Sequence, residues 1–516
     1  MTLLIRNTMV LRDAQSAPED ATDILIEGAT IAAIGRDLPV PPGAEVIDGT
    51  NRIALPGFVN AHTHSNESFE QGFYDAMPLE VWLAWKYPPF AVPRLPERVH
   101  YLRTMLLAIE CVRSGVTMVQ DDLINGLADP AAFDGSAAAY HDIGLRASIT
   151  VSMSDKPPLA SMLWTDDFLA PDLAEDLSKA RALTWDEHLA LFRRHHARWN
   201  GAGQDRLRVI LGPIGPQWCS DRLLAEVAAL SVAEGIPVHT HTLESKIHTV
   251  QAQQFYGRPM VEHLAALGVL TPHFALNHAV WLTDPEIELI ATHGSSITHN
   301  PMSNLKLGCG IARIPALRAA GVPIGIGTDG TSTSDRADMF RSLALAAILH
   351  RVADLDPSTW PDAADAFEMA TLGGARTAGR AAEVGRLEPG RKADLMLVDR
   401  HDYGLIPLKA PLSQLVYGVN SDAVQSVIVD GRIVMADRRL TQVDETALKA
   451  EIAEEAARYL RDHVPVMEAV ARRYDGYWRR THLRAAATIV PASHAPVRLP
   501  CGCTPAATIH TCARLD

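Results

Sequence analysis

The stretch LPGFVNAHTHSNESFEQG, residues 55–72, joins an apolar run to a His-Thr-His triplet and a polar loop that contains glycine. In a β-strand, residues two apart point to the same face, so His62 and His64 would aim both imidazole rings at one point in space. Two convergent imidazoles indicate a metal site, but a His-x-His triplet also occurs by chance and predicts little on its own. The interpretation therefore depends on whether the rest of the chain supplies further ligands.

The sequence around this stretch has the repeating pattern of a barrel. Over residues 57–379, short apolar runs alternate with longer segments of helical period. Examples of the runs are VTMVQDD, LRASITVSM, LRVILGPIG and IPVHTHT, while SDRLLAEVAALSVAEG and TDPEIELIATHG read as amphipathic helices with Ser or Thr caps. Repeated β-then-α units predict a parallel sheet covered by helices, and about eight strands favour an α/β fold of the (β/α)8 TIM-barrel type.

Strand-like segments return on both sides of the barrel. LLIRNTMVL and DILIEGATIAAIG precede it, and GRLEPGRKADLMLVD and VQSVIVDGRIVMAD follow it. These flanks predict one small composite β-sandwich domain made of residues 1–56 and 380–440. We expect residues 441–486 to form a C-terminal helical segment and residues 487–516, which have no clear period, to be a poorly ordered tail.

Composition and charge exclude several classes of protein. The chain has 516 residues and a net charge of −14 at pH 7, which argues against binding to nucleic acid or to an anionic membrane. No window reaches the roughly 18 apolar residues that a membrane span needs. The N-terminus lacks the pattern of a signal peptide, and the six cysteines do not resemble a disulfide framework. We therefore expect a cytoplasmic protein.

Further polar side chains follow the apolar runs of the barrel. They are His239, His241, Glu244, His278, His299, Asn304 and Asp329. The C-terminal ends of barrel strands meet at one face, so we expect these side chains to gather with His62 and His64. Three imidazoles and a carboxylate suit a divalent metal ion with one position open to water. Spacing along the strand does not choose between His239 and His241 as the ligand.

The motifs PGFVNAHTH, HxxE, a lone His, HNPxSNLKL and GTDG resemble those of the amidohydrolase superfamily, over about residues 1–440. Within it, the match is to aminoheteroaromatic deaminases and triazine chlorohydrolases. The resemblance implies a ligand set of His62, His64, His241 and Asp329.

The resemblance also implies the roles of the remaining polar residues. Glu244 becomes the proton shuttle, His278 orients and polarises the metal-bound water, and Asp329 accepts the water proton. His239 is then a supporting residue. His299 either lines the pocket or shapes its loop.

The implied reaction is the hydrolytic deamination of a small nitrogen-rich aromatic molecule. The alternative keeps the same site and changes the leaving group to chloride, an alkylamine or the amine of an aryl urea. A non-catalytic scaffold is a remote possibility, because such relatives typically lack metal ligands. We expect a small-molecule substrate and a homo-oligomer, either a dimer or a tetramer.

Two departures from the family bear on the substrate. Nucleoside deaminases of this branch have a Glu after a Trp-Pro pair, whereas this chain reads WKYPPFAVP with Phe90 near that place. They also have a His on the fourth strand where this chain has Ile214. We therefore expect a base, triazine, pterin or other small nitrogen-rich aromatic rather than a nucleoside, with an apolar substituent as one option. Trp85, Phe90, Ile214 and Asn304 are the predicted substrate contacts, although Trp85 and Phe90 equally suit a helix that packs its aromatic rings on the barrel.

One divalent ion per chain is expected, rather than two. Binuclear barrels of this superfamily bridge their ions with a lysine at the end of the fourth strand. Here the strand LRVILGPIG offers no Lys, Cys or Glu at its end, and a second ion would need such an anionic bridge to offset charge repulsion. Three imidazoles and a carboxylate suit zinc first and iron(II) second.

Overall fold

The computed structural model describes residues 2–124, 129–352 and 356–490, and its centre is an eight-stranded parallel sheet. The strands run in chain order: β6 (Phe58–Thr63), β7 (Val116–Asp121), β8 (Arg146–Met153), β9 (Leu207–Pro213), β10 (Val238–Thr242), β11 (Phe274–His278), β12 (Ser296–His299) and β13 (Ile324–Ile326). The segment after β13 returns to β6, where the Asp329 amide donates to the His62 carbonyl oxygen at 2.9 Å. The predicted α/β barrel is confirmed.

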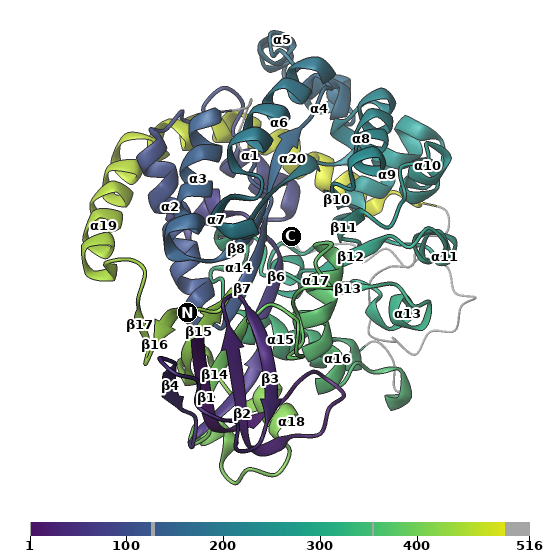
Figure 1. Cartoon of the computed structure of the whole chain (residues 1–516). Helices are drawn as coiled ribbons and strands as arrows, with labels where there is room; N and C mark the ends of the chain where they lie inside the picture. Colours follow the sequence, from purple (N-terminus) through teal and green to yellow (C-terminus); the bar gives the residue numbers. More distant parts are fainter. Residues whose placement is uncertain (1, 125–128, 353–355, 491–516) are drawn as a thin grey trace.

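Helices cover the outside of this barrel (Figure 1). The longer ones are α2 (Glu97–Arg113), α3 (Pro130–Ile143), α6 (Trp185–Trp199), α8 (Asp221–Glu234), α9 (Lys246–Tyr256), α10 (Met260–Ala266), α11 (Asp284–Thr292) and α15 (Met339–Ile348). Shorter ones are α7 (Ala202–Asp205), α12 (Pro301–Lys306), α13 (Ile314–Ala319), α14 (Thr331–Ser334), α16 (Ala363–Glu368) and α17 (Gly374–Thr377). As the sequence predicts, Ser220 caps α8 and Thr283 forms a capping box with Glu286 in α11.

A second, mixed sheet combines both flanks of the chain below the barrel (Figure 1). The N-terminal flank gives β1 (Thr2–Val10), β2 (Glu19–Glu27), β3 (Thr30–Gly35), β4 (Glu45–Asp48) and β5 (Arg52–Pro56). The C-terminal flank gives β14 (Leu395–Asp399), β15 (Val424–Val429), β16 (Arg432–Ala436), β17 (Arg439–Leu440) and the helix α18 (Pro411–Gly418). β5 pairs antiparallel with β14, so the two flanks share one sheet and one apolar core. The exact domain boundaries remain predictions.

Two features lie above the C-terminal ends of the barrel strands. The first is the long connection from β8 to β9, which contains α4 (Thr165–Phe168) and α5 (Pro171–Ser178) before α6. The second is α20 (Val464–Ala487), which follows α19 (Glu445–Asp462) and packs against α1 (Leu79–Lys86) and α9. Among the described residues, no helix combines the length and apolar character needed to cross a lipid bilayer. Most of the predicted tail lies outside the described residues.

A buried ion pair joins the barrel to the small β-domain. Arg146, the first residue of β8, donates to Asp394 at 2.9 and 3.0 Å and to Asp430 at 3.1 Å. All three side chains are almost completely excluded from solvent. The neighbouring carboxylates raise the pKa of Arg146 although burial opposes its charge.

We expect Arg146→Met to destabilise the fold, because it leaves the buried Asp394 carboxylate without its cationic partner. Removing one member of a buried pair costs about 3–5 kcal/mol. The free energy of unfolding in urea measures this cost. The control is Arg98→Met, whose pair with Glu451 is exposed and contributes at most about 1 kcal/mol. Equal losses in the two variants would contradict the prediction.

Candidate metal centre

The imidazoles of His62 and His64, at the end of the first barrel strand, face the carboxylate of Asp329, which follows the last strand. His64 Nε2 lies 3.2 Å and His62 Nε2 lies 3.5 Å from Asp329 Oδ1. All three side chains are buried. Burial alone would raise the pKa of Asp329, but the two imidazoles hold it well below its usual range, so the carboxylate is ionised.

His241 approaches the same point from β10. Its Nε2 lies 3.2 Å from His64 Nε2, and its Nδ1 donates to the Ile214 carbonyl oxygen at 2.8 Å. In the same way, His64 Nδ1 donates to the Asp122 carbonyl oxygen at 2.6 Å. A carbonyl can only accept, so each Nδ1 carries a proton and each Nε2 is the atom that a metal ion would meet. Burial opposes the charge of His64, but contact with Asp329 raises its pKa to about 10, so a bound ion would displace the proton from its Nε2. Burial lowers the pKa of His241 to about 3, which keeps the ring neutral.

The cluster has the properties of a divalent metal site. His62 Nε2 and His278 Nε2 are buried and have no hydrogen-bond partner, and such groups are costly when nothing fills the gap. The ligand atoms of His62, His64 and Asp329 lie within 4.8 Å of one another, as do those of His62, His241 and His278. Neutral imidazoles with one carboxylate are ligands that zinc and similar ions prefer.

Glu244 and His278 stand side by side next to this cluster. Glu244 Oε1 lies 3.6 Å from His278 Nδ1, which is also 2.9 Å from Asn304 Oδ1. Burial raises the pKa of Glu244 well above its usual value, and the charge of Asp329 raises it further. A carboxyl that keeps its proton near neutral pH can act as a general acid.

The backbone at the strand ends is held in an uncommon conformation. Leu243, His278, Ala279 and Asp329 have φ values of 49°, 69°, 47° and 61°, in the left-handed region that non-glycine residues rarely adopt. Such residues cost about 1–3 kcal/mol each and persist where the surroundings hold them. Here the bend at Ala279 is held by its amide, which donates to the Thr242 carbonyl oxygen at 3.0 Å.

Gly330 in the TDG motif is required by close packing. A Cβ atom at this position would lie 1.9 Å from Glu67 Oε2. The Gly330 amide donates to Asp329 Oδ1 at 2.7 Å, which fixes the orientation of the carboxylate.

A cavity of about 320 Å³, here called the inner cavity, opens beside the metal centre. His64, His241, Glu244, His278 and Asp329 lie at one end of it. Its other walls are mainly apolar and aromatic, and include Leu79, Trp82, Leu83, Tyr87, Met162, Leu177, Ile214, Trp218, Leu307, Tyr474 and Trp478. The site can therefore hold a flat, largely apolar molecule against the polar cluster.

The four predicted substrate contacts lie in different places. Ile214 lines the inner cavity, whereas Asn304 binds His278. Trp85 does not line this cavity, because its indole N–H donates to Asp475 of α20 at 2.9 Å. Phe90 is 66% exposed and lines an adjoining outer cavity. The aromatic residue that α1 presents to the inner cavity is Trp82, because α20 covers the side of α1 that carries Trp85.

The other histidines occupy supporting positions. His239 Nε2 lies 2.8 Å from His62 Nδ1 and so orients that ring. His299 is buried beside His350, with a ring separation of 5.5 Å, and does not line the inner cavity.

Two acidic residues at the site are not among the side chains predicted from the sequence. Asp122, at the end of β7, accepts from Thr150 at 2.6 Å and lies 3.4 Å from His241 Nδ1; burial raises its pKa to about 6. Glu67 accepts from the Tyr87 hydroxyl at 2.9 Å. Asp122 could have been found, since VTMVQDD ends in acidic residues at a barrel strand end. Glu67 lies in the short 3-10 helix Ser65–Glu70 after the first barrel strand, where the sequence has no recognisable motif.

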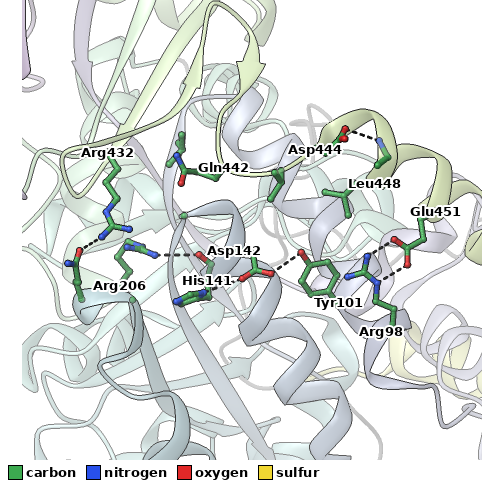
Figure 2. Close-up of a pocket in the computed structure, with 16 residues that line it drawn as sticks. Arg98, Tyr101, His141, Asp142, Arg206, Arg432, Gln442, Asp444, Leu448 and Glu451 are labelled. Carbon is green, nitrogen blue, oxygen red and sulfur yellow. Dashed lines mark hydrogen bonds and ion pairs between the residues drawn. The ribbon is translucent and has the colours of Figure 1, made fainter. Parts of the chain in front are cut away.

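A wider groove of about 760 Å³ lies elsewhere, between α2, α3, β16 and α19 (Figure 2). Its charged side chains bind one another: Arg98 pairs with Glu451, and the Tyr101 hydroxyl donates to Asp142 at 3.1 Å. It adjoins the N-terminal ends of β8 and β9, the opposite edge of the barrel from the histidines. It therefore takes no part in the metal centre.

A parallel barrel with imidazoles and a carboxylate at its C-terminal strand ends defines the class of metal-dependent hydrolases. The model of the Amidohydrolase family matches residues 53–434, and the chain belongs to this family.

Two curated relatives are both deaminases. The chain is 34% identical over 434 residues to a 5'-deoxyadenosine deaminase of Methanothermobacter thermautotrophicus, covering 84% of this chain and 93% of the relative. It is 34% identical over 439 residues to a 5-methylthioadenosine/S-adenosylhomocysteine deaminase of Pelotomaculum thermopropionicum, with the same coverage.

Two solved structures resemble the fold. An adenosine deaminase from Xanthomonas campestris with bound zinc has a TM-score of 0.78 and 29% identity, covering 88% of this chain and 98% of the other. An atrazine chlorohydrolase from Arthrobacter aurescens complexed with zinc has a TM-score of 0.79 and 25% identity, covering 88% of this chain and all of the other.

We expect His64→Asn to lower the metal content of the purified protein at least tenfold, because it removes one of the converging Nε2 atoms. Metal analysis by mass spectrometry measures the ions per chain. His141→Asn is the control, since His141 is exposed on the far edge of the barrel. Full metal content in the His64 variant would show that the ion binds elsewhere.

Proposed function

We propose that this protein is a metal-dependent aminohydrolase that removes an amino group from a compact, nitrogen-rich aromatic ring. The observation that carries the proposal is the position of Glu244, a buried carboxyl beside His278 and the metal centre, at one end of an aromatic cavity. The deaminases among its relatives support this reaction. The products would be a ring carbonyl and ammonia.

We assign His62, His64, His241 and Asp329 as the ligands of one divalent ion. His241 is preferred to His239 because its Nε2 faces His64, whereas Nε2 of His239 contacts His62. Zinc is the first choice, since both solved relatives described above bind it, and iron(II) is the second. When bound, the ion would lower the pKa of a coordinated water from about 16 towards about 7.

The protein side chains then move the protons. Asp329 accepts a proton from the attacking water, and Nε2 of His278 is free to orient this water because Nδ1 contacts Asn304. Glu244 donates its proton to a ring nitrogen as the oxygen adds to the carbon that bears the amino group. Asp329 then passes the water proton to the amine, which leaves as ammonia, and the remaining proton of the added hydroxyl returns to Glu244 as the ring carbonyl forms.

A second candidate reaction exchanges a different leaving group in the same site. The structural match to atrazine chlorohydrolase favours release of chloride from a triazine, and the same chemistry would release an alkylamine or the amine of an aryl urea. The converging ligand atoms argue against a non-catalytic scaffold. Release of ammonia or chloride from aminopyrimidines, purine bases, pterins and chlorotriazines distinguishes these reactions.

We further propose that the protein is a homo-oligomer, either a dimer or a tetramer, and that it acts in the cytoplasm on a small molecule. Light scattering of the purified protein measures the oligomeric state.

Glu244→Gln is expected to keep the fold and the metal but to lose about 10²–10⁴-fold in kcat, because the amide cannot shuttle a proton. Ammonia release at saturating substrate gives kcat, and metal analysis checks the ion. Glu234→Gln, on the outer surface of the barrel, is the matched control. A Glu244 variant with wild-type kcat would exclude it as the acid and base.

Chelation is expected to abolish activity, and one equivalent of zinc per chain should restore it fully. The reason is that the residues at the end of β9 provide no anionic bridge for a second ion. Titration of the metal-free protein with zinc gives the stoichiometry. Activity that saturates only at two equivalents would contradict the proposal of one ion.

A further inference from the structure

We propose that the C-terminal helix α20 selects the substrate, through Tyr474 and Trp478, and that it selects for an apolar substituent on the reacting ring. This inference rests on the aminohydrolase function proposed above. It assigns substrate recognition to a helix outside the barrel and names the class of substrate: an aromatic amine that carries an alkyl or aryl group in place of a sugar.

Tyr474 and Trp478 line the same inner cavity as Glu244 and His278. They are four residues apart on α20 and therefore lie on the same face of the helix. Tyr474 is 2% exposed, and the Trp478 ring packs against the apolar residues contributed by the β8–β9 connection and by α9. Two large aromatic side chains thus form a wall of the cavity in which the substrate would react.

The cavity walls contributed by the elements that pack against α20 are also mainly apolar. Met162 and Leu177 come from the β8–β9 connection, and Leu79 and Trp82 come from α1. An alkyl or aryl group enclosed by these side chains would be removed from water, and this burial of apolar surface stabilises binding.

A sugar would fit this chamber poorly. Among the described residues that line the inner cavity, the only carboxylates are Glu244 and Asp329, and both are assigned to the chemistry. Lys156, the only other charged residue of the described lining apart from the histidines, lies over the rings of Phe255 and Tyr256 at 5.7 and 5.4 Å. Ser154, Ser161 and Thr333 add only neutral hydroxyl groups to the lining. Ribose hydroxyls set against the aromatic faces of the α20 wall would lose hydrogen bonds to water without gaining an ionised partner.

Polar contacts along its length hold α20 in place. The Tyr477 hydroxyl donates to the Leu163 carbonyl oxygen at 2.7 Å, and Lys246 Nζ donates to the Ala486 carbonyl oxygen at 2.6 Å. These partners belong to the β8–β9 connection and to α9, which share one apolar cluster with the end of α20.

A third contact connects α20 to the loop that carries Glu244. His482 Nδ1 lies 2.9 Å from Glu80 Oε2, and the other oxygen of Glu80 accepts from the hydroxyl of Ser245. Ser245 directly follows Glu244. The wall is therefore fixed relative to the reacting groups, and a rigid wall discriminates between substituents better than a mobile one.

The test compares adenine, 9-benzyladenine and 5'-deoxyadenosine as probes, which share one amino-bearing ring. Their Kd values are measured by calorimetry on the zinc-loaded Glu244→Gln protein, with and without Trp478→Ala. The values of kcat and KM are measured on proteins that keep Glu244, again with and without Trp478→Ala. We expect the benzyl compound to bind at least tenfold more tightly than the ribosyl compound. Trp478→Ala should reduce this ratio at least tenfold, mainly through KM, and Trp478→Phe should retain most of it.

The control on the same helix is Leu483→Ala, because Leu483 is 67% exposed and does not line the cavity. This substitution should leave the Kd of all three compounds unchanged. Preferred binding of the ribosyl compound, an equal effect of Trp478→Ala on all three, or no binding of any of them would overturn the inference. Because binding is measured without turnover, selective binding with no ammonia release would refute the proposed reaction and leave the role of α20 standing.

Discussion

The chemistry of this protein depends on the contact between the first and last strands of the barrel. The Thr63 hydroxyl donates to the Asp329 carbonyl oxygen at 3.0 Å, 266 residues later in the chain, and Asn60 Nδ2 donates to the Thr328 hydroxyl at 2.8 Å. The middle strands of the barrel supply imidazoles, but the carboxylate that joins them comes only from the segment after β13. Closure of the barrel and assembly of the metal centre are therefore one structural event.

The same enclosure sets the protonation states that the proposed reaction needs. Burial lowers the pKa of His241 to about 3 and that of His278 to about 4, so both rings are neutral. It acts in the opposite direction on Glu244, which keeps its proton, while contact with two imidazoles keeps Asp329 ionised. Two carboxyl groups in one cavity thus have opposite charge states. A bound cation would relieve part of the cost of burying these groups and so stabilise the folded state.

The barrel and its polar strand ends could be predicted because they are encoded locally. Alternation of apolar runs with helical periods marks the strands, and a histidine such as His278 directly follows an apolar run. Trp85 could not be placed in the same way, because its environment depends on α20, about 390 residues further along the chain. Neither Tyr474 nor Trp478 has any local feature that distinguishes it from an aromatic residue packed in an ordinary helix. The walls of the cavity are long-range properties of the fold, whereas the proposed metal ligands lie in short motifs.

The position of α20 also has a consequence for the order in which the molecule is completed during synthesis. A chain grows from its N-terminus, so all of the strands that carry the metal centre leave the ribosome before the helix that walls the cavity. The reactive end of the site and the part that contacts the rest of the substrate are thus encoded more than 100 residues apart, between Asp329 and Tyr474. Changes in α20 can accumulate without altering a proposed metal ligand, which gives this architecture a direct route to new substrates with its chemistry unchanged.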